Sequence, residues 1–216
     1  DLHSFPTRRS SDLVGVEVGD FVVSDATCNY SFDESDHVLT LSSNGKASIS
    51  MKSGVFSTSH RIKIAAGSNI NLTIKDLTVS SEKSGLVFPN GIGECNLILV
   101  GSNTFKSSGR YQSAVSKMKN GKLTILGNGK LTAIAAGNES SGIGDIYGCQ
   151  NLYIESGTIY AKGYGAMGIG NIPSFAENIV YYKGGTVEGV GDGYGGITGA
   201  QRSEEHTSEL QSRSAI

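Results

Sequence analysis

The sequence predicts an all-β protein and, more closely, a single-stranded right-handed parallel β-helix (a solenoid) with about 27 residues per coil. Three observations support this prediction. Glycine supplies 30 of the 216 residues, about twice its usual share of a soluble protein. Short apolar strands recur at one period along the chain, and the spacing typical of amphipathic helices is nearly absent.

The first recurring element is a short apolar strand that asparagine often precedes. Its copies begin at Leu72, Leu97, Leu123, Leu152 and Ile179, a spacing of about 25–29 residues. A chain that returns to one side at this period can stack its strands about 4.8 Å apart and bury each inward side chain against the next coil. Asparagines at matching positions can then hydrogen-bond from coil to coil.

Two further elements share the period. A second strand follows the first after a short turn, as at Leu77 and Leu131. A third element is rich in Gly and Ser and carries one aliphatic residue per coil. The aliphatic positions, at steps of about 28 residues, are Val87, Val115 and Ile143, and then Ile169 and Ile197. Each coil is therefore expected to hold about three short strands, with glycines at the corners, where φ turns positive.

The chain divides into four segments. Residues 14–60 are expected to form an N-terminal cap with the first irregular coils, and residues 61–201 the regular coils. All the glycines lie within these two segments. The N-terminal end, 1–13, contains HSFPTRRSSDL, and the C-terminal end, 202–216, contains RSEEHTSELQS. Both stretches resemble translated sequencing adapters. We expect both ends to be adapter-derived and disordered or frayed, and the chain to be a metagenomic fragment.

The regular coils resemble a known group of proteins. The resemblance is carried by SGIG (141–144), GAMGIGN (165–171), GNGKLTA (127–133) and ESGTIYAKG (155–163). These are similar to Gly-rich repeats in secreted and surface proteins of gut Firmicutes, in which neighbouring modules are labelled carbohydrate-binding. The resemblance implies a pectate-lyase-like β-helix in an extracellular or cell-surface bacterial protein, with a polysaccharide or a host or bacterial glycan as its partner.

Composition excludes several classes of function. With 18 basic and 20 acidic residues the formal charge is −2, too near neutral to attract nucleic acid. No apolar run is long enough to span a bilayer. Cys95 and Cys149 are expected two coils apart, about 10 Å along the axis, so free buried thiols are predicted rather than a disulfide. His37 and His60 are isolated in the sequence, and no metal site or cofactor is predicted.

An enzyme stays open as an alternative, because parallel β-helices include polysaccharide lyases and glycoside hydrolases. Arg61-Ile62-Lys63 matches a tripeptide with which polygalacturonases hold a substrate carboxylate, but their other motifs do not occur. The acids Asp145, Glu155, Glu177 and Asp192 fall at different phases of the coil. No pair of carboxylates is therefore expected to converge for hydrolysis, and no catalytic residue is predicted.

The sequence favours a noncatalytic structural or glycan-binding module. Aromatic side chains combine a large apolar face with a polar tip, so five tyrosines near the C-terminal end are candidates for stacking on sugar rings: Tyr160, Tyr164, Tyr181, Tyr182 and Tyr194. A second alternative is a self-associating adhesin stalk, because an open last coil exposes strand edges that can pair with another molecule.

Overall fold

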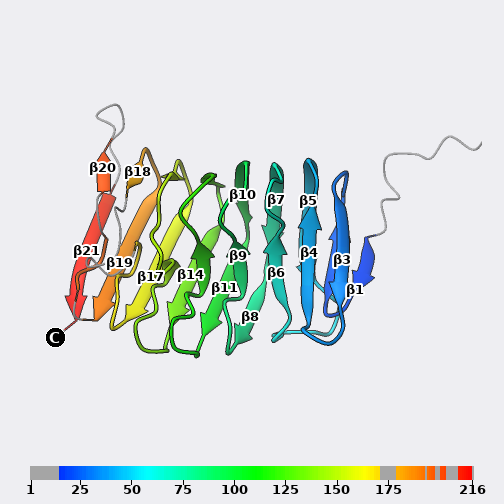
Figure 1. Ribbon diagram of the computed structural model, residues 1–216, viewed down its shortest axis with the longest axis horizontal. Coiled ribbons are helices and arrows are strands. Elements are labelled where there is room, and N and C mark those ends of the chain that lie inside the picture. The colour runs from blue at the N-terminus through cyan, green and yellow to red at the C-terminus, as the bar shows by residue number, and fades with distance from the viewer. Residues whose placement is uncertain (1–14, 171–178, 193, 198–199, 203–208, 216) are drawn as a thin grey trace, which may run out of the picture.

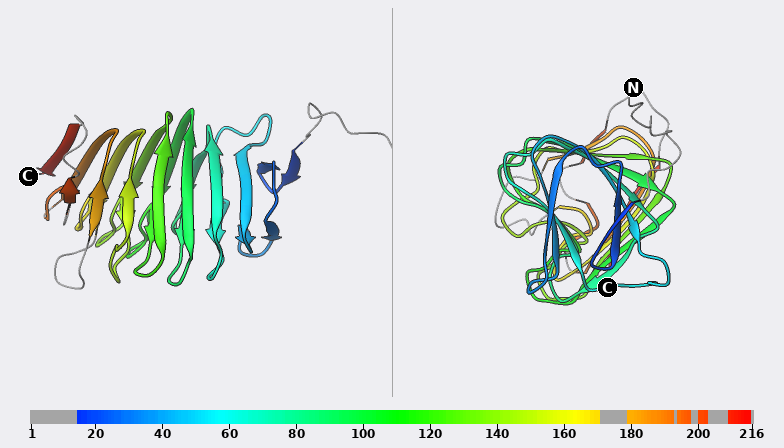
Figure 2. Two further views of the ribbon diagram at one scale, coloured as in Figure 1. Left: turned by 90° about the horizontal axis from the view of Figure 1, so that it is seen from above. Right: turned by 90° about the vertical axis from the view of Figure 1, so that its right-hand side faces the viewer.

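The structure is a computed structural model that describes residues 15–170, 179–192, 194–197, 200–202 and 209–215. These residues form strands and turns and contain no helix. The strands stack side by side into successive coils (Figure 1), and the end-on view shows the coils superimposed on one another (Figure 2). The prediction of an all-β parallel β-helix is confirmed.

Three sheets, named A, B and C, form the sides of the coil. Sheet A contains, in spatial order, β1 (Val16–Val18), β2 (Phe21–Ser24), β5 (Gly45–Met51), β7 (Ile70–Lys75), β10 (Glu94–Val100), β13 (Lys122–Gly127), β16 (Leu152–Ile154), β18 (Val180–Tyr182) and β20 (Ala200–Arg202). Sheet B contains β3 (Asn29–Asp33), β4 (Val38–Ser42), β6 (Arg61–Ile64), β9 (Leu86–Phe88), β12 (Val115–Lys117) and β15 (Ile143–Gly144). Sheet C contains β8 (Thr78–Ser81), β11 (Ser102–Ser107), β14 (Lys130–Ala135), β17 (Thr158–Tyr164), β19 (Thr186–Asp192) and β21 (Glu209–Ala215).

The two ends of the stack differ in strand pairing. At the N-terminal end β1 pairs with β2, β2 with β5 and β3 with β4, all antiparallel. Every later pairing of strands is parallel among the described residues. At the C-terminal end β21, which lies in the segment expected to be adapter-derived and disordered or frayed, pairs in parallel with β19. Residues 1–13 lie outside the described residues.

The observed register corrects the predicted one at two positions in sheet A. Leu97 pairs with Leu72 as predicted, but its partner in the next coil is Ile125 rather than Leu123. A slip of two residues keeps the same face inward, because side chains alternate along a strand. The second difference is a shift of one residue, which exchanges the inward and outward faces of the strand. Val180, and not the predicted Ile179, pairs with Leu152 and is buried, whereas Ile179 is half-buried.

The corrected register shows that the coils lengthen after Leu97. The step from Leu72 to Leu97 spans about 25 residues. The later steps in sheet A, to Ile125, Ile154 and then Tyr182, each span about 28–29 residues. In sheet B the predicted pairing of Val115 with Ile143 is confirmed. The predicted pairing of Val115 with Val87 is wrong, because Val115 pairs with Leu86 and Val87 faces outward.

The core consists of columns of apolar side chains that run along the stack. Leu72, Leu97, Ile125 and Ile154 form one such column and are 0–1% exposed. Outside the core, Asn96 Nδ2 donates to Asn71 Oδ1 at 2.7 Å, which confirms the predicted contact between asparagines of successive coils. Because these columns fill the interior of the coil, side chains that could bind a ligand lie on the outer faces of the sheets.

Candidate functional site

A groove with a cavity volume of about 590 Å³ lies over the outer face of sheet B. Strand β6 shows how the sequence builds its floor. Ile62 and Ile64 are 0% exposed and pack into the core, so the alternation of a strand turns Arg61 and Lys63 outward into the groove. The remaining floor residues come from β4, β9 and β12: Val38, Thr40, Val87 and Ser116. The groove therefore crosses several coils and runs along the helix axis.

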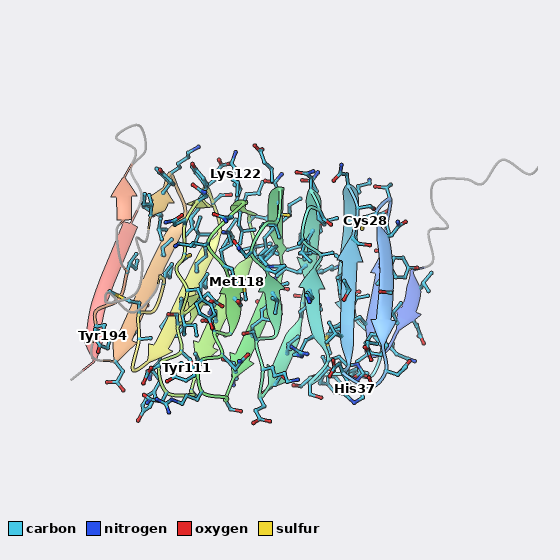
Figure 3. All side chains as sticks on the ribbon, viewed as in Figure 1. Cys28, His37, Tyr111, Met118, Lys122 and Tyr194 are labelled. Atoms are coloured by element: carbon cyan, nitrogen blue, oxygen red, sulfur yellow. The ribbon has the colours of Figure 1, made fainter. Side chains whose placement is uncertain are left out.

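The walls of the groove come from the turns on either side of sheet B. One wall precedes the strands and includes Asp36, Arg110 and Tyr111; the other follows them and includes Met118 and Tyr147. Tyr111 precedes β12 and Met118 follows it, and the two residues lie apart along the strand direction (Figure 3). An elongated ligand lying along the axis would lie between these two walls.

Two exposed tyrosines that were not among the predicted candidates lie in the groove. Tyr111 is 40% exposed and Tyr147 is 68% exposed. Tyr111 has a φ of 61°, which is uncommon for a residue with a side chain, and the Arg110 guanidinium lies 4.5 Å from its ring centroid. Arg110 in turn donates to Glu139 at 3.0 Å. The Glu139 carboxylate thus orients the Arg110 guanidinium over the Tyr111 ring.

Asp145 is the buried carboxylate of the groove, with 7% exposure. It accepts hydrogen bonds from Ser116 Oγ at 2.8 Å and from the Tyr147 backbone N–H at 3.1 Å. Burial raises its pKa, and these two hydrogen bonds and the charge of Lys117 oppose the rise. Asp145 therefore fixes the turn that carries Tyr147 and is the groove residue most like a general acid.

The other carboxylates of the groove lie far from Asp145. Asp33 and Asp36 stand at the β3 and β4 end. Between β4 and β15 there are four strand spacings in sheet B, or roughly 19 Å at about 4.8 Å each. Glycosidase carboxylates are only about 5–9.5 Å apart. The groove carboxylates therefore do not form the pair that hydrolysis of a glycoside needs.

The acids that the sequence analysis considered lie on different faces. Asp145 is in the groove on sheet B, Glu155 forms an ion pair with Lys183 at 3.3 Å beyond β16, and Asp192 ends β19 in sheet C. Glu177 lies outside the described residues.

The five predicted tyrosines are not brought together, and two of them have little free surface. Tyr182 is 1% exposed, and its hydroxyl donates to the Gly185 carbonyl. Its ring is part of the core, so the prediction that it stacks on a sugar does not fit this position. Tyr181 is half-buried on sheet A and stacks on Tyr153 with ring centroids 4.4 Å apart. One face of Tyr181 is thus already covered.

The remaining three predicted tyrosines lie away from the groove. Tyr160 is half-buried and Tyr164 is 48% exposed, both on β17 in sheet C. Tyr194 is 47% exposed in the turn after β19. A signal for the groove tyrosines was present in the sequence, because Tyr111 and Tyr147 each lie close to a Gly/Ser-rich element that forms sheet B.

The core beneath the groove contains a charged side chain. Lys117 is 0% exposed and pairs in register with Phe88 of the preceding coil. Its Nζ donates to the carbonyls of Met118 and Gln150. Burial lowers the pKa of Lys117 and raises the pKa of the neighbouring Cys149 thiol to about 12. These contacts tie β12 to the segment that follows Asp145 and Tyr147.

All three cysteines are buried free thiols, as predicted. Cys95 lies on β10, two strands from β16, which Cys149 precedes. The observed positions agree with the predicted separation of two coils.

The two histidines are isolated in the sequence but not in the structure. The rings of His37 and His60 stack with centroids 4.8 Å apart at 12°. His60 Nδ1 accepts the Asp20 backbone N–H at 3.1 Å. This cluster joins the β1–β2 turn to the first coils. No group of three or more His, Cys, Asp or Glu side chains that could hold a metal ion occurs among the described residues.

Comparisons with protein-family models, curated proteins and solved structures give no match to this chain. In the part of the chain that the structure describes, no helix is long and apolar enough to cross a membrane.

Proposed function

We propose that this chain is a noncatalytic glycan-binding β-helix module of a secreted or cell-surface bacterial protein. The observation that carries the proposal is the axial groove over sheet B, in which two exposed tyrosines lie among charged and hydroxyl side chains. A polysaccharide is an extended chain of rings with apolar faces and polar rims. Tyrosine faces suit the rings, and convergent polar groups in a groove suit the hydroxyls.

The cellular location rests on a different argument. It is supported by the resemblance of the Gly-rich coils to surface proteins of gut Firmicutes. The alternative of a self-associating stalk rests on the exposed strand edges of a solenoid. Sedimentation at several protein concentrations distinguishes a stalk that self-associates from a module that binds glycan as a monomer.

A polysaccharide lyase or hydrolase is the second candidate, and Asp145 is the observation that favours it. A buried carboxyl with a raised pKa in a groove is typical of a general acid. Against it, the groove carboxylates are separated by roughly four strand spacings, which is too far for paired acid–base catalysis. Binding without turnover is therefore the expected behaviour.

Affinity electrophoresis against a panel of neutral and acidic polysaccharides tests the proposal. We expect retardation by at least one polymer, and we expect Tyr111→Ala and Tyr147→Ala each to weaken it. Tyr194→Ala is the matched control, because Tyr194 is similarly exposed and lies outside the groove. Equal loss in Tyr194→Ala, or no retardation by any polymer, contradicts the proposal. Release of reducing ends or unsaturated sugars from the bound polymer would establish the enzyme instead.

A further inference from the structure

The outer face of sheet C carries positive charge over successive coils. Strands β8, β11, β14 and β17 lie side by side in the stack (Figure 1). Lys106, Lys130 and Lys162 are exposed on this face, because the residues that alternate with them along their strands are buried. None of the outward residues described on these four strands is a carboxylate; apart from the lysines they are threonines, serines, tyrosines and one isoleucine.

These three lysines are not neutralised by the protein. None of them forms an ion pair or a side-chain hydrogen bond with a described residue. On sheet A, by contrast, Lys122 pairs with Glu94 and Lys183 pairs with Glu155. An unpaired ammonium group offers three hydrogen-bond donors and a full point charge. The outer face of sheet C is therefore complementary to an anion that another molecule supplies.

Two of the lysines alternate with apolar side chains along the helix axis. Lys106 pairs in register with Ile134, Ile134 with Lys162, and Lys162 with Val190. We call these four residues the lysine column. Because neighbouring strands lie about 4.8 Å apart, its two lysines are about 10 Å apart along the axis, with the half-buried Ile134 between them. Lys130 lies outside the column, four residues from Ile134 on β14 and thus roughly 13 Å away.

The spacing of the lysine column matches a linear polysaccharide that lies along the helix axis. One sugar advances an extended chain by a length close to the strand spacing of about 4.8 Å. If one sugar lies at Lys106, the next lies over Ile134 and the third reaches Lys162. An anionic group gains an ion pair at either lysine, whereas one held over Ile134 loses water without gaining a partner. The column therefore favours charge on every second sugar.

A row of hydroxyl groups runs beside the lysine column. Thr104, Thr132 and Tyr160 pair in register two residues away from the column on the same face of the sheet. Their hydroxyl groups can both donate and accept hydrogen bonds, as the hydroxyl groups of a sugar do. The combination of cations, hydroxyl groups and one aromatic ring favours a sugar polymer as the partner of this face.

We propose that the outer face of sheet C binds a linear polysaccharide in which acidic sugars alternate with neutral ones. Lys106 and Lys162 bind the acidic groups, and Ile134 contacts the neutral sugar between them. This face is separate from the groove over sheet B, so the inference goes beyond the proposed function and does not rest on the groove.

Titration calorimetry at physiological salt with three oligosaccharides of equal length tests the charge pattern. The probes are hyaluronan, in which glucuronate alternates with a neutral amino sugar, oligogalacturonate, in which every sugar is charged, and a neutral cello-oligosaccharide. We expect hyaluronan to bind most tightly, by about tenfold over the neutral probe, which is the gain that two exposed ion pairs allow. Added salt should reduce this gain, because both contacts are exposed.

Three variants locate the effect. Lys106→Gln with Lys162→Gln should lower the affinity for hyaluronan to that for the neutral probe. Lys130→Gln is the matched control: it removes a charge from the same face, but its distance from the column exceeds the Debye length of about 8 Å, so the affinity should change by less than about twofold. Ile134→Lys fills the gap between the two lysines and should shift the preference to oligogalacturonate. Thermal unfolding shows whether each variant folds, and the two single lysine variants replace the pair if it does not.

Several results would overturn the lysine column. They are tightest binding of oligogalacturonate or of the neutral probe to the wild type, equal loss in Lys130→Gln, and an unchanged preference in Ile134→Lys. Equal binding of a single-stranded oligonucleotide with the same number of charges would also overturn it, because the face would then attract any polyanion. So would the failure of all three probes to bind.

The groove and the lysine column fail separately. Tyr111→Ala and Tyr147→Ala should leave the binding of hyaluronan unchanged, and the lysine variants should leave unchanged the retardation that depends on those tyrosines. Loss of hyaluronan binding in the tyrosine variants alone would place the polymer in the groove, which overturns the lysine column and leaves the proposed function standing.

Discussion

Lys117 Nζ donates a hydrogen bond to the Gln150 carbonyl at 2.9 Å from inside the core. One coil earlier the same column holds the buried ring of Phe88. This position of the column thus holds an apolar ring in one coil and a hydrogen-bonded lysine in the next, the coil that leads to Asp145 and Tyr147. Desolvation of the ammonium opposes this arrangement, and the two carbonyl contacts offset it.

The first prediction concerns the side chain at Lys117. Lys117→Met keeps most of the buried volume and removes the desolvated charge, so we expect a free energy of unfolding within about 1 kcal/mol of wild type. Lys117→Ala leaves a cavity and should lose about 2–5 kcal/mol. Urea denaturation of both variants at neutral pH measures the difference. If Lys117→Met lost as much as Lys117→Ala, the hydrogen bonds of the ammonium would outweigh its volume.

The second prediction concerns the pH dependence of stability at Asp145. Burial raises its pKa above the ordinary 3.8, so the folded state binds the proton more tightly than the unfolded state. The corresponding stabilisation is complete below pH 3.8 and is lost as the pH rises through the raised folded value. We therefore expect wild type to lose stability relative to Asp145→Asn as the pH increases from about 4 to about 7.

Paired urea titrations across that range check the sign. Asp33→Asn serves as the comparison and is titrated below that range as well: hydrogen bonds lower the pKa of Asp33, so its stabilisation is present above pH 3.8 and is lost as the pH falls through the lowered folded value. A constant difference between wild type and Asp145→Asn would contradict the prediction.

The fold could be predicted from the sequence because its signal is local and repeated. Apolar alternation at Leu72 and again at Leu97 reports the inward face of each strand directly. The register between coils was harder to predict from the sequence. The slip between Leu123 and Ile125 arises because extra residues enter at a corner, and a corner carries no apolar pattern with which to count them. The alternation itself does not change under a slip of two residues.

The site could not be predicted in the same way. Arg61, Tyr111 and Tyr147 belong to different coils and meet only because the coils stack in the observed register. The predicted tyrosines are those that lie close together along the chain, and one of them, Tyr182, is a core residue. Whether a side chain faces a groove depends on the sheet to which its turn belongs, and that assignment requires the register first.

The third prediction concerns a polar residue in an apolar column. Asn103 is 1% exposed and pairs in register with Leu131. Its Oδ1 accepts the Leu77 backbone N–H at 3.1 Å, and its Nδ2 donates to the carbonyls of Val100 and Lys130. Asn103→Leu matches the apolar neighbours but leaves these buried backbone groups without partners.

We expect Asn103→Leu to lower the free energy of unfolding by about 1–3 kcal/mol despite its greater hydrophobicity. Leu131→Asn, the reverse change one coil later, is the comparison and should cost at least as much, because it buries an amide at a leucine position. Chemical denaturation of both variants provides the measurement. A stabilised Asn103→Leu would mean that the column tolerates the unpaired backbone groups.

The fourth prediction separates backbone strain from steric conflict at two glycine corners. Gly67 and Gly121 have φ values of 75° and 85°, so alanine is strained at both. A Cβ at Gly67 would meet nothing within 4 Å, whereas one at Gly121 would lie 2.1 Å from the Ile92 carbonyl oxygen. Gly67→Ala should therefore cost about 1–2 kcal/mol, the usual cost of the left-handed conformation. Gly121→Ala should cost more, because the Ile92 backbone of the preceding coil must also move. The melting temperatures of the two variants give the comparison. Equal losses of stability would contradict this expectation. They would show that the backbone at Ile92 moves at little cost, and that glycine is needed at position 121 only for its positive φ.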